Sequence, residues 1–231
     1  MTYDLLIGDR AYSSWSLRGW LLFERFGIPV TTLAARMYDP DFPAKLATFP
    51  PARTVPAMRT PDGVVVADTL AMAEELSTRH PDAGVWPDDP AARATARMMA
   101  AEMHSSFGAL RSQCPMNLLT AYTGMDIDAD LRADLDRLET IWAHARRMAG
   151  PGAWLFGRYS AADVFFAPVA ARIAGYDLPV GPDAAAYVDT HLADPGFTAW
   201  RASALDENRV LDRYDRPFAR RPWPANGIAS R

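Results

Sequence analysis

The chain has 231 residues, of which 49% are hydrophobic and 23% are charged, an ordinary balance for a globular protein of one large or two modest domains. Its formal net charge of −4 argues against nucleic acid or an anionic membrane as a partner. A single cysteine, Cys114, excludes an internal disulfide framework and is typical of a reducing compartment. We see no signal sequence and no apolar run of about 18 residues, so we expect a cytoplasmic protein.

The first 80 residues alternate between short apolar runs and amphipathic ones. Two strands joined through a helix form a parallel pair, and the turn Thr60-Pro-Asp-Gly63 predicts an antiparallel hairpin. The result is a mixed four-stranded sheet in an α/β unit. In chain order we expect a strand at 4–8, a helix at 15–26, a strand at 30–34, a helical turn at 43–48, strands at 55–59 and 63–67, and a helix at 70–79.

The pattern changes after a linker that is rich in proline. Beyond it only helical periodicity is found, which predicts an all-helical second domain. The helices are expected at 91–111, 131–149, 162–175, 183–192 and 195–205. The predicted division of the chain is a first domain at 1–80, a linker at 81–90, a helical domain at 91–214 and a loose or draped tail at 215–231.

Two stretches carry local signals. Ser13, Ser14 and Ser16 lie between the first strand and the first helix, where hydroxyls accept from free N–H groups and the helix dipole favours an anion. Capping alone would also explain these serines. Ser160 and Asp163 have the spacing of a capping box, which predicts a folding role at the start of a very apolar helix.

Taken in order, five stretches over about 160 residues resemble the glutathione transferase superfamily. That resemblance implies a thioredoxin-like first domain and an all-helical second one. The serine-rich stretch is most similar to the zeta class of this superfamily. The matching stretches are Tyr12-Ser-Ser-Trp-Ser-Leu-Arg18, Thr54-Val-Pro-Ala-Met58, Ala67-Asp-Thr-Leu-Ala-Met72, Trp86-Pro-Asp-Asp-Pro90 and Trp154-Leu-Phe-Gly-Arg-Tyr-Ser-Ala-Ala-Asp163.

The resemblance also assigns a glutathione site. It places Ser13 at the catalytic position, as a hydrogen-bond donor that favours the glutathione thiolate, with Ser14 and more weakly Tyr12 as alternatives. It implies a cis bond between Val55 and Pro56 that presents the Val55 backbone to the cysteinyl residue of glutathione. The expected glutathione-binding residues are Ser14, Trp15, Arg53, Val55, Pro56, Asp68 and Thr69.

Other positions depart from the family pattern. Trp15 replaces the zeta-class cysteine, which puts redox chemistry by the protein itself in doubt. Arg53 stands where a glycine is usual, and we expect it to reach the glycyl carboxylate of glutathione. Zeta-class maleylacetoacetate isomerases have an arginine seven residues after the proline of the buried helix. Here that position is Gly175, and Arg172 lies one turn earlier, so isomerase activity is not supported.

A second substrate would lie against the first helix of the second domain. Methionines and aromatic rings suit a plastic apolar pocket, although core packing explains most of them equally well. The histidines are scattered and Cys114 has no partner at ligand spacing, so no metal site is expected. The candidate lining residues are Met103, His104, Phe107, Arg111 and Asn117.

These observations predict a glutathione transferase-like enzyme with glutathione as co-substrate. It would present the thiolate to a small electrophile for conjugation, peroxide reduction or cis–trans isomerisation. The alternative is a non-catalytic protein that holds glutathione or a hydrophobic ligand on the same fold. The resemblance further implies a homodimer, with the first domain of one subunit against the helices of the other.

Overall fold

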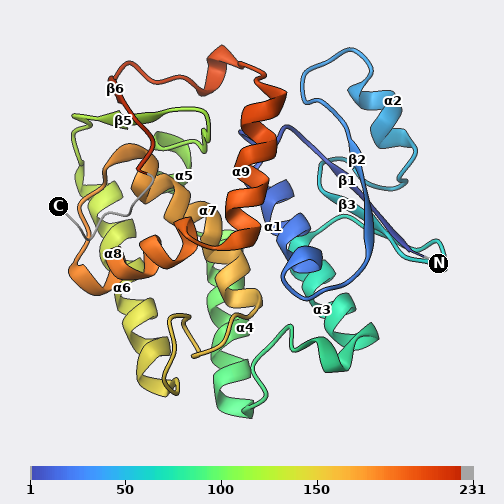
Figure 1. Cartoon of the computed structure of the whole chain (residues 1–231), viewed down its shortest axis with the longest axis horizontal. Coiled ribbons are helices and arrows are strands. Elements are labelled where there is room, and N and C mark those ends of the chain that lie inside the picture. Colours follow the sequence, from blue (N-terminus) through green and yellow to red (C-terminus); the bar gives the residue numbers. More distant parts are fainter. Residues whose placement is uncertain (1, 225–231) are drawn as a thin grey trace.

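The computed structural model describes residues 2–224, so the part of the predicted tail at 225–231 lies outside the described residues. A mixed four-stranded sheet with three helices precedes a set of packed helices, which confirms the predicted fold class (Figure 1). We call residues 3–79 the sheet part and residues 90–207 the helical part.

The sheet has the strand order β2-β1-β3-β4. β1 runs parallel to β2, as a βαβ unit requires, and β3 runs antiparallel to both β1 and β4. The hairpin strands are shorter than predicted because β3 and β4 pair over two positions only. The elements of the sheet part are β1 (Tyr3–Ile7), α1 (Ser14–Glu24), β2 (Val30–Ala34), α2 (Phe42–Ala47), β3 (Ala57–Arg59), β4 (Val65–Val66) and α3 (Thr69–Arg79).

The central strand β1 is covered on both faces. Leu5 and Ile7 belong to the main hydrophobic cluster together with Leu17 and Leu21 of α1, whereas Leu6 joins a smaller cluster against α2. This is the two-residue alternation of a strand buried on both sides. Accordingly α1 and α3 lie between the sheet and the helical part, and α2 lies beyond the sheet (Figure 1).

Helix α7 forms the centre of the helical part. All 16 of its residues are buried, as its apolar sequence predicts, and it packs against α1, α4 and α8. One continuous hydrophobic cluster includes β1, α1 and α7, so the two parts of the chain share a core. The helices are α4 (Pro90–Ser105), α5 (Gly108–Gln113), α6 (Ala129–Met148), α7 (Ala161–Tyr176), α8 (Pro182–Leu192) and α9 (Pro195–Glu207).

The prediction of one long helix over 91–111 is wrong. α4 ends at Ser105, and Phe107 adopts a left-handed conformation with φ of 61° before α5 begins. A non-glycine residue in that region ends a helix, and here it carries the Phe107 ring into the core, where 3% of the residue is exposed. Asp134 of α6 then accepts from the Leu110 N–H at 2.9 Å, a tertiary contact that local periodicity does not reveal.

The described part of the predicted loose tail contains regular structure that the sequence analysis missed. β6 (Ala219–Arg221) pairs antiparallel with β5 (Ala121–Thr123), which precedes α6. Arg221 strengthens this contact by donating from Nη2 to the Ala174 carbonyl of α7 at 2.6 Å. The chain between α9 and β6 includes a 3₁₀ turn, η2 (Asp212–Tyr214).

The capping box at the start of α7 is confirmed. Asp163 Oδ2 accepts from the Ser160 backbone N–H at 2.9 Å and from its hydroxyl at 3.2 Å. The other carboxylate oxygen accepts from the Leu155 N–H and the Tyr187 hydroxyl. Burial raises the pKa of this carboxyl to about 6, against which the four hydrogen bonds act.

Buried His191 makes folding sensitive to acid. It is 1% exposed between the rings of Trp154 and Tyr187, and burial lowers its pKa to about 3. The unfolded chain, with a His pKa near 6.5, binds the extra proton first as the pH falls, so this residue costs stability below about pH 6.5. Between pH 7 and pH 5 we expect His191 to lower the free energy of unfolding by about 2 kcal/mol.

Urea unfolding at pH 7 and pH 5 checks this expectation. His191→Gln should lose less stability over that interval than the unchanged protein, whereas His144→Gln, on the exposed face of α6, should lose as much as the unchanged protein. An equal loss in both variants would contradict the assignment to His191.

Candidate functional site

A cavity of about 550 Å³ opens where the sheet part meets the helical part. The start of α1, the loops before α2 and β3, the end of α5, α7 and η2 all contribute to its walls. Its lining residues are Tyr12, Ser13, Ser14, Trp15, Met37, Tyr38, Asp39, Phe42, Pro43, Arg53, Thr54, Val55, Arg111, Pro115, Met116, Arg172 and Tyr214.

Ser13 caps α1 from the floor of this cavity. Its hydroxyl accepts from the Ser16 N–H at 3.2 Å and donates to the Ser16 hydroxyl at 2.7 Å. Ser16 in turn accepts from the Gly8 N–H at 2.9 Å, which ties the end of β1 to the helix. The Ser13 hydroxyl is therefore engaged within its own loop, and the residue is 7% exposed.

Ser14, the first residue of α1, has a different environment. Its oxygen accepts from Arg172 Nη2 at 3.3 Å, and within residues 2–224 its own hydrogen has no acceptor. The helix N-terminus and the guanidinium both favour negative charge at this point. The hydroxyl is thus a free donor at an electropositive corner of the cavity.

Three arginines surround this corner without a carboxylate partner among the described residues. Arg172 donates to the Cys114 and Pro168 carbonyls, and Arg18 to the Phe165 carbonyl. Arg111 donates to the His104 carbonyl at 3.1 Å. Burial lowers the pKa of Arg172 to about 10, with Arg111 adding to the effect, and lowers that of Arg18 well below its usual range.

Trp15 contacts two of these three arginines. Its ring lies 4.4 Å from the Arg18 guanidinium and 4.9 Å from that of Arg111, and the His104 ring is 5.0 Å away. Arginine stays protonated in proteins, and an aromatic face partly offsets the loss of water around a cation. The positive charge is therefore held beside the cavity by rings and carbonyls, which do not neutralise it.

Three tyrosines form another part of the cavity wall. Tyr12 stacks on Tyr214 with ring centroids 4.6 Å apart, and the Tyr38 and Tyr214 hydroxyls are 3.2 Å apart. The Tyr12 hydroxyl donates to the Arg209 carbonyl and accepts from the Leu211 N–H, both at 3.1 Å. Its hydrogen is therefore already committed outside the cavity, and burial raises the pKa of Tyr12.

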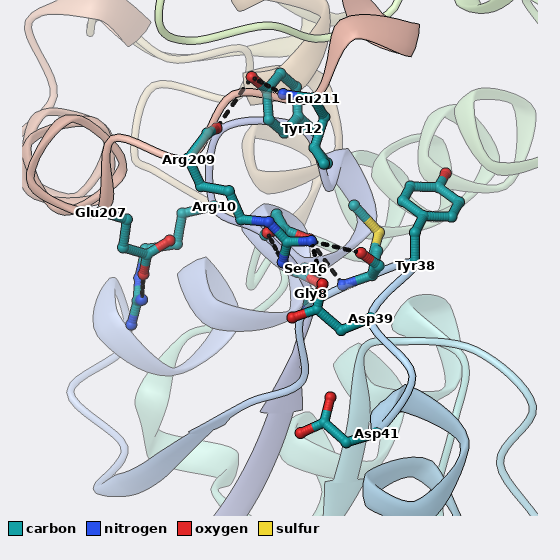
Figure 2. A network of polar contacts seen from close by, with 12 residues as sticks. Gly8, Arg10, Tyr12, Ser16, Tyr38, Asp39, Asp41, Glu207, Arg209 and Leu211 are labelled. Carbon is teal, nitrogen blue, oxygen red and sulfur yellow. Dashed lines mark hydrogen bonds and ion pairs between the residues drawn. The ribbon is translucent and has the colours of Figure 1, made fainter.

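The tyrosine wall depends on the segment 208–214, which we call the strap. Arg209 crosses from the strap to the sheet part and donates to Asp9 at 2.9 Å. It also donates to Asp39 at 2.6 Å (Figure 2). Asp39 is the one carboxylate among the described residues that line the cavity. Because Arg209 pairs with it, the charge of the lining is dominated by arginines.

Asp68 and Thr69 lie at the start of α3, outside that lining. Asp68 Oδ1 caps the helix by accepting from the Leu70 and Ala71 N–H groups, and Oδ2 is 3.2 Å from His104 Nε2. The Thr69 hydroxyl is buried without a hydrogen-bond partner in residues 2–224. A hydroxyl donor without a partner among the described residues and a carboxylate thus lie together at this helix N-terminus.

The remaining predicted site residues are divided. Arg53 and Val55 line the cavity, and the Val55–Pro56 bond is cis, as the resemblance implies. Pro56 packs instead on α1 at Gly19, where an added Cβ would come within 2.8 Å of its ring. Of the residues predicted to line a substrate pocket, Arg111 alone lines the cavity. Met103 and Phe107 are in the hydrophobic core. Asn117 forms hydrogen bonds with the Tyr122 hydroxyl and the Leu119 N–H, and His104 faces Asp68.

Sequence reasoning missed Tyr38 and Tyr214, and it gave Arg172 no place in the substrate pocket. The sequence did point to Arg172, because an arginine within such an apolar helix needs polar partners for its guanidinium. It did not point to Tyr214, because a return of the strap to the first loop is a tertiary event. Within residues 2–224 no cluster of His, Cys, Asp or Glu has a geometry that would hold a metal, and none of the helices has the length and apolarity to span a bilayer.

Comparison with known proteins agrees with this geometry. The sequence profile described as "Glutathione S-transferase, N-terminal domain" matches residues 12–79. A maleylacetoacetate isomerase from Pseudomonas aeruginosa is 30% identical over 67% of this chain and 74% of its own. The chain belongs to the glutathione transferase superfamily. The match to that isomerase agrees with the zeta-like character of the serine-rich motif.

Solved structures of the superfamily share the fold at low identity. A glutathione transferase homolog from Burkholderia gl BGR1, crystallised with glutathione, superposes with a TM-score of 0.65 at 20% identity over 89% of this chain and 99% of its own. Glutathione transferase Omega 2S from Trametes versicolor, in complex with 2,4-dihydroxybenzophenone, gives 0.67 at 18% identity over 91% and 100% of the two chains.

The strap should contribute measurably to stability. Arg209→Gln leaves Asp9, which is 4% exposed, with only the Met37 N–H as partner. We expect a loss of about 2 kcal/mol in the free energy of unfolding, the scale for hydrogen bonds to charged groups. Arg10→Gln breaks the more exposed ion pair with Glu207 next to it and should cost less than about 1 kcal/mol. Equal losses in urea unfolding would contradict the anchoring role of Arg209.

Proposed function

We propose that the protein binds glutathione between the N-terminal ends of α1 and α3 and activates its thiol for attack on an electrophile. The observation that carries the proposal is the free Ser14 hydroxyl at a helix N-terminus, beside Arg172 and two further arginines that have no carboxylate partner. A thiolate there would gain a hydrogen bond, the helix dipole and uncompensated positive charge. The bound glutathione in two structures of similar fold supports the choice of thiol.

The rest of glutathione has matching groups. The α-carboxylate would accept from the buried Thr69 hydroxyl at the N-terminus of α3, and the α-ammonium would pair with Asp68. Val55 and Arg53 both line the cavity. The Val55 backbone would pair with the cysteinyl residue, and Arg53 would bind the glycyl carboxylate. The sheet part, residues 1–80 in the predicted division, would then be the glutathione-binding domain.

Between the two serines, the geometry favours Ser14 as donor to the thiolate, with Ser13 as the helix cap and alternative donor. Conjugation is the reaction we favour, with peroxide reduction and isomerisation as the other uses of the same thiolate. The relative named an isomerase is the reason to assay cis–trans isomerisation too. The non-catalytic alternative predicts glutathione binding without turnover of any of these substrates.

Serine variants separate the two roles. Ser14→Ala should raise the pKa of the thiol of bound glutathione and lower kcat/KM at neutral pH by about 10- to 100-fold, because a hydrogen-bond donor to the reacting sulfur is lost. Ser13→Ala should instead cost about 1 kcal/mol of stability through the lost cap. Thiolate absorbance across pH measures the thiol pKa, and conjugation of 1-chloro-2,4-dinitrobenzene measures kcat/KM. A larger pKa change in Ser13→Ala would reverse the assignment.

Calorimetric titration with reduced glutathione tests the binding site. Asp68→Asn keeps a good helix cap but removes the charge, and should weaken binding by about 1.5–3 kcal/mol, the range for a charge-assisted hydrogen bond. Asp88→Asn, at an exposed position in the linker, is the matched control and should bind normally. Absence of binding by the unchanged protein would refute the proposed function.

The family resemblance also supports a homodimer in which the sheet part of one subunit faces the helices of the other. Met98 on α4 is 49% exposed and is one apolar side chain that such an interface would cover. Sedimentation velocity decides this proposal directly.

A further inference from the structure

Two features of the cavity are not used by the residues proposed above to bind glutathione. One is the positive charge of Arg111 and Arg172, which come from α5 and α7 of the helical part. The other is the wall of three tyrosines contributed by the first loop, the loop before α2 and the strap. Both face the space beyond Ser14, where a second substrate must lie to meet the thiol.

Arg111 and Arg172 together provide more positive charge than a single thiolate needs. Arg172 is aimed at Ser14 and so at the sulfur. Arg111 is held by the His104 and Ser106 carbonyls through Nη1 alone, so Nε and Nη2 have no hydrogen-bond partner within residues 2–224. A guanidinium with two free parallel donors fits a carboxylate in a bidentate way. The paired Asp39 offers no competing charge.

The tyrosine wall selects shape rather than charge. Tyr12 and Tyr214 are stacked at 4.6 Å, and Tyr38, 56% exposed, stands at the rim. Burial raises the pKa of both Tyr12 and Tyr214, so the rings are neutral at physiological pH. Neutral aromatic faces pack best against another flat ring.

We propose that the second substrate is an aromatic electrophile bearing a carboxylate, whose ring packs on Tyr12, Tyr38 and Tyr214 and whose carboxylate pairs with Arg111. The proposal rests on the proposed glutathione-activating function and narrows it to a substrate class. With an aryl chloride the sulfur forms a bond to the ring carbon, and chloride leaves with the electron pair of the broken C–Cl bond. The thiol proton passes to solvent when the thiolate forms.

A matched pair of electrophiles tests this class. The probes are 4-chloro-3-nitrobenzoate and its methyl ester, each rate being divided by the uncatalysed rate with glutathione to remove the difference in ring reactivity. We expect the enhancement to be at least about tenfold larger for the benzoate, the lower end for a charged hydrogen bond. Arg111→Gln should abolish that preference and Arg111→Lys should restore part of it, while Tyr38→Leu should lower both rates.

Direct binding guards against variants that fail to fold. The glutathione conjugate of the benzoate should bind the unchanged protein at least about tenfold more tightly than the conjugate of the ester, by calorimetry. Equal enhancement and equal conjugate binding would overturn the substrate class and leave the glutathione function standing. Failure to bind glutathione at all would overturn both.

Discussion

Helix α7 is buried along its whole length, and the two charged residues it carries must therefore be satisfied without bulk water. Asp163 is satisfied at the N-terminal end by four hydrogen bonds from three segments. Arg172 is satisfied nearer the C-terminal end by the carbonyls of Cys114 and Pro168 and by Ser14. The first arrangement fixes where the helix begins, and the second fixes which face meets the cavity.

The partners of Arg172 explain why the site is electropositive. Carbonyl dipoles and a hydroxyl compensate the lost hydration of a guanidinium while leaving its net charge in place. Arg18 and Arg111 are held in the same manner, by carbonyls and by their contacts with the Trp15 ring. A carboxylate partner would have given a more conventional ion pair and removed the attraction for an anion.

Local sequence signals predicted most of the fold. The strand at 30–34, the capping box and the order β-α-β-α-β-β-α follow from periodicity, turns and caps, which act over a few residues. The break at Phe107 and the β5–β6 ribbon depend on contacts with Asp134 and with residues a hundred positions away, which no local window contains.

The same distinction applies to the candidate site. The motif around Ser13 and Ser14 is contiguous and was found from the sequence, and the cavity brings these serines to Arg53, Val55 and Arg111. Met103 and Phe107 illustrate the limit of composition, since apolar side chains near a pocket and in a core have the same pattern. The tyrosine wall was not predicted, because its three residues are about 25 to 200 positions apart in the chain and no local pattern links them.

The strap has a consequence for synthesis of the chain on the ribosome. All of the sheet and the serine loop are made within the first 79 residues, but Arg209 must meet Asp9 across an interval of 200 positions. Contacts of such separation form late, because closing a long loop precedes any gain from it. A nascent chain that has emerged only as far as α9 therefore has the corner around Ser14 and Arg172 before it has a closed cavity. The tyrosine wall, which needs Tyr214 of the strap, is the last part of the cavity to be built.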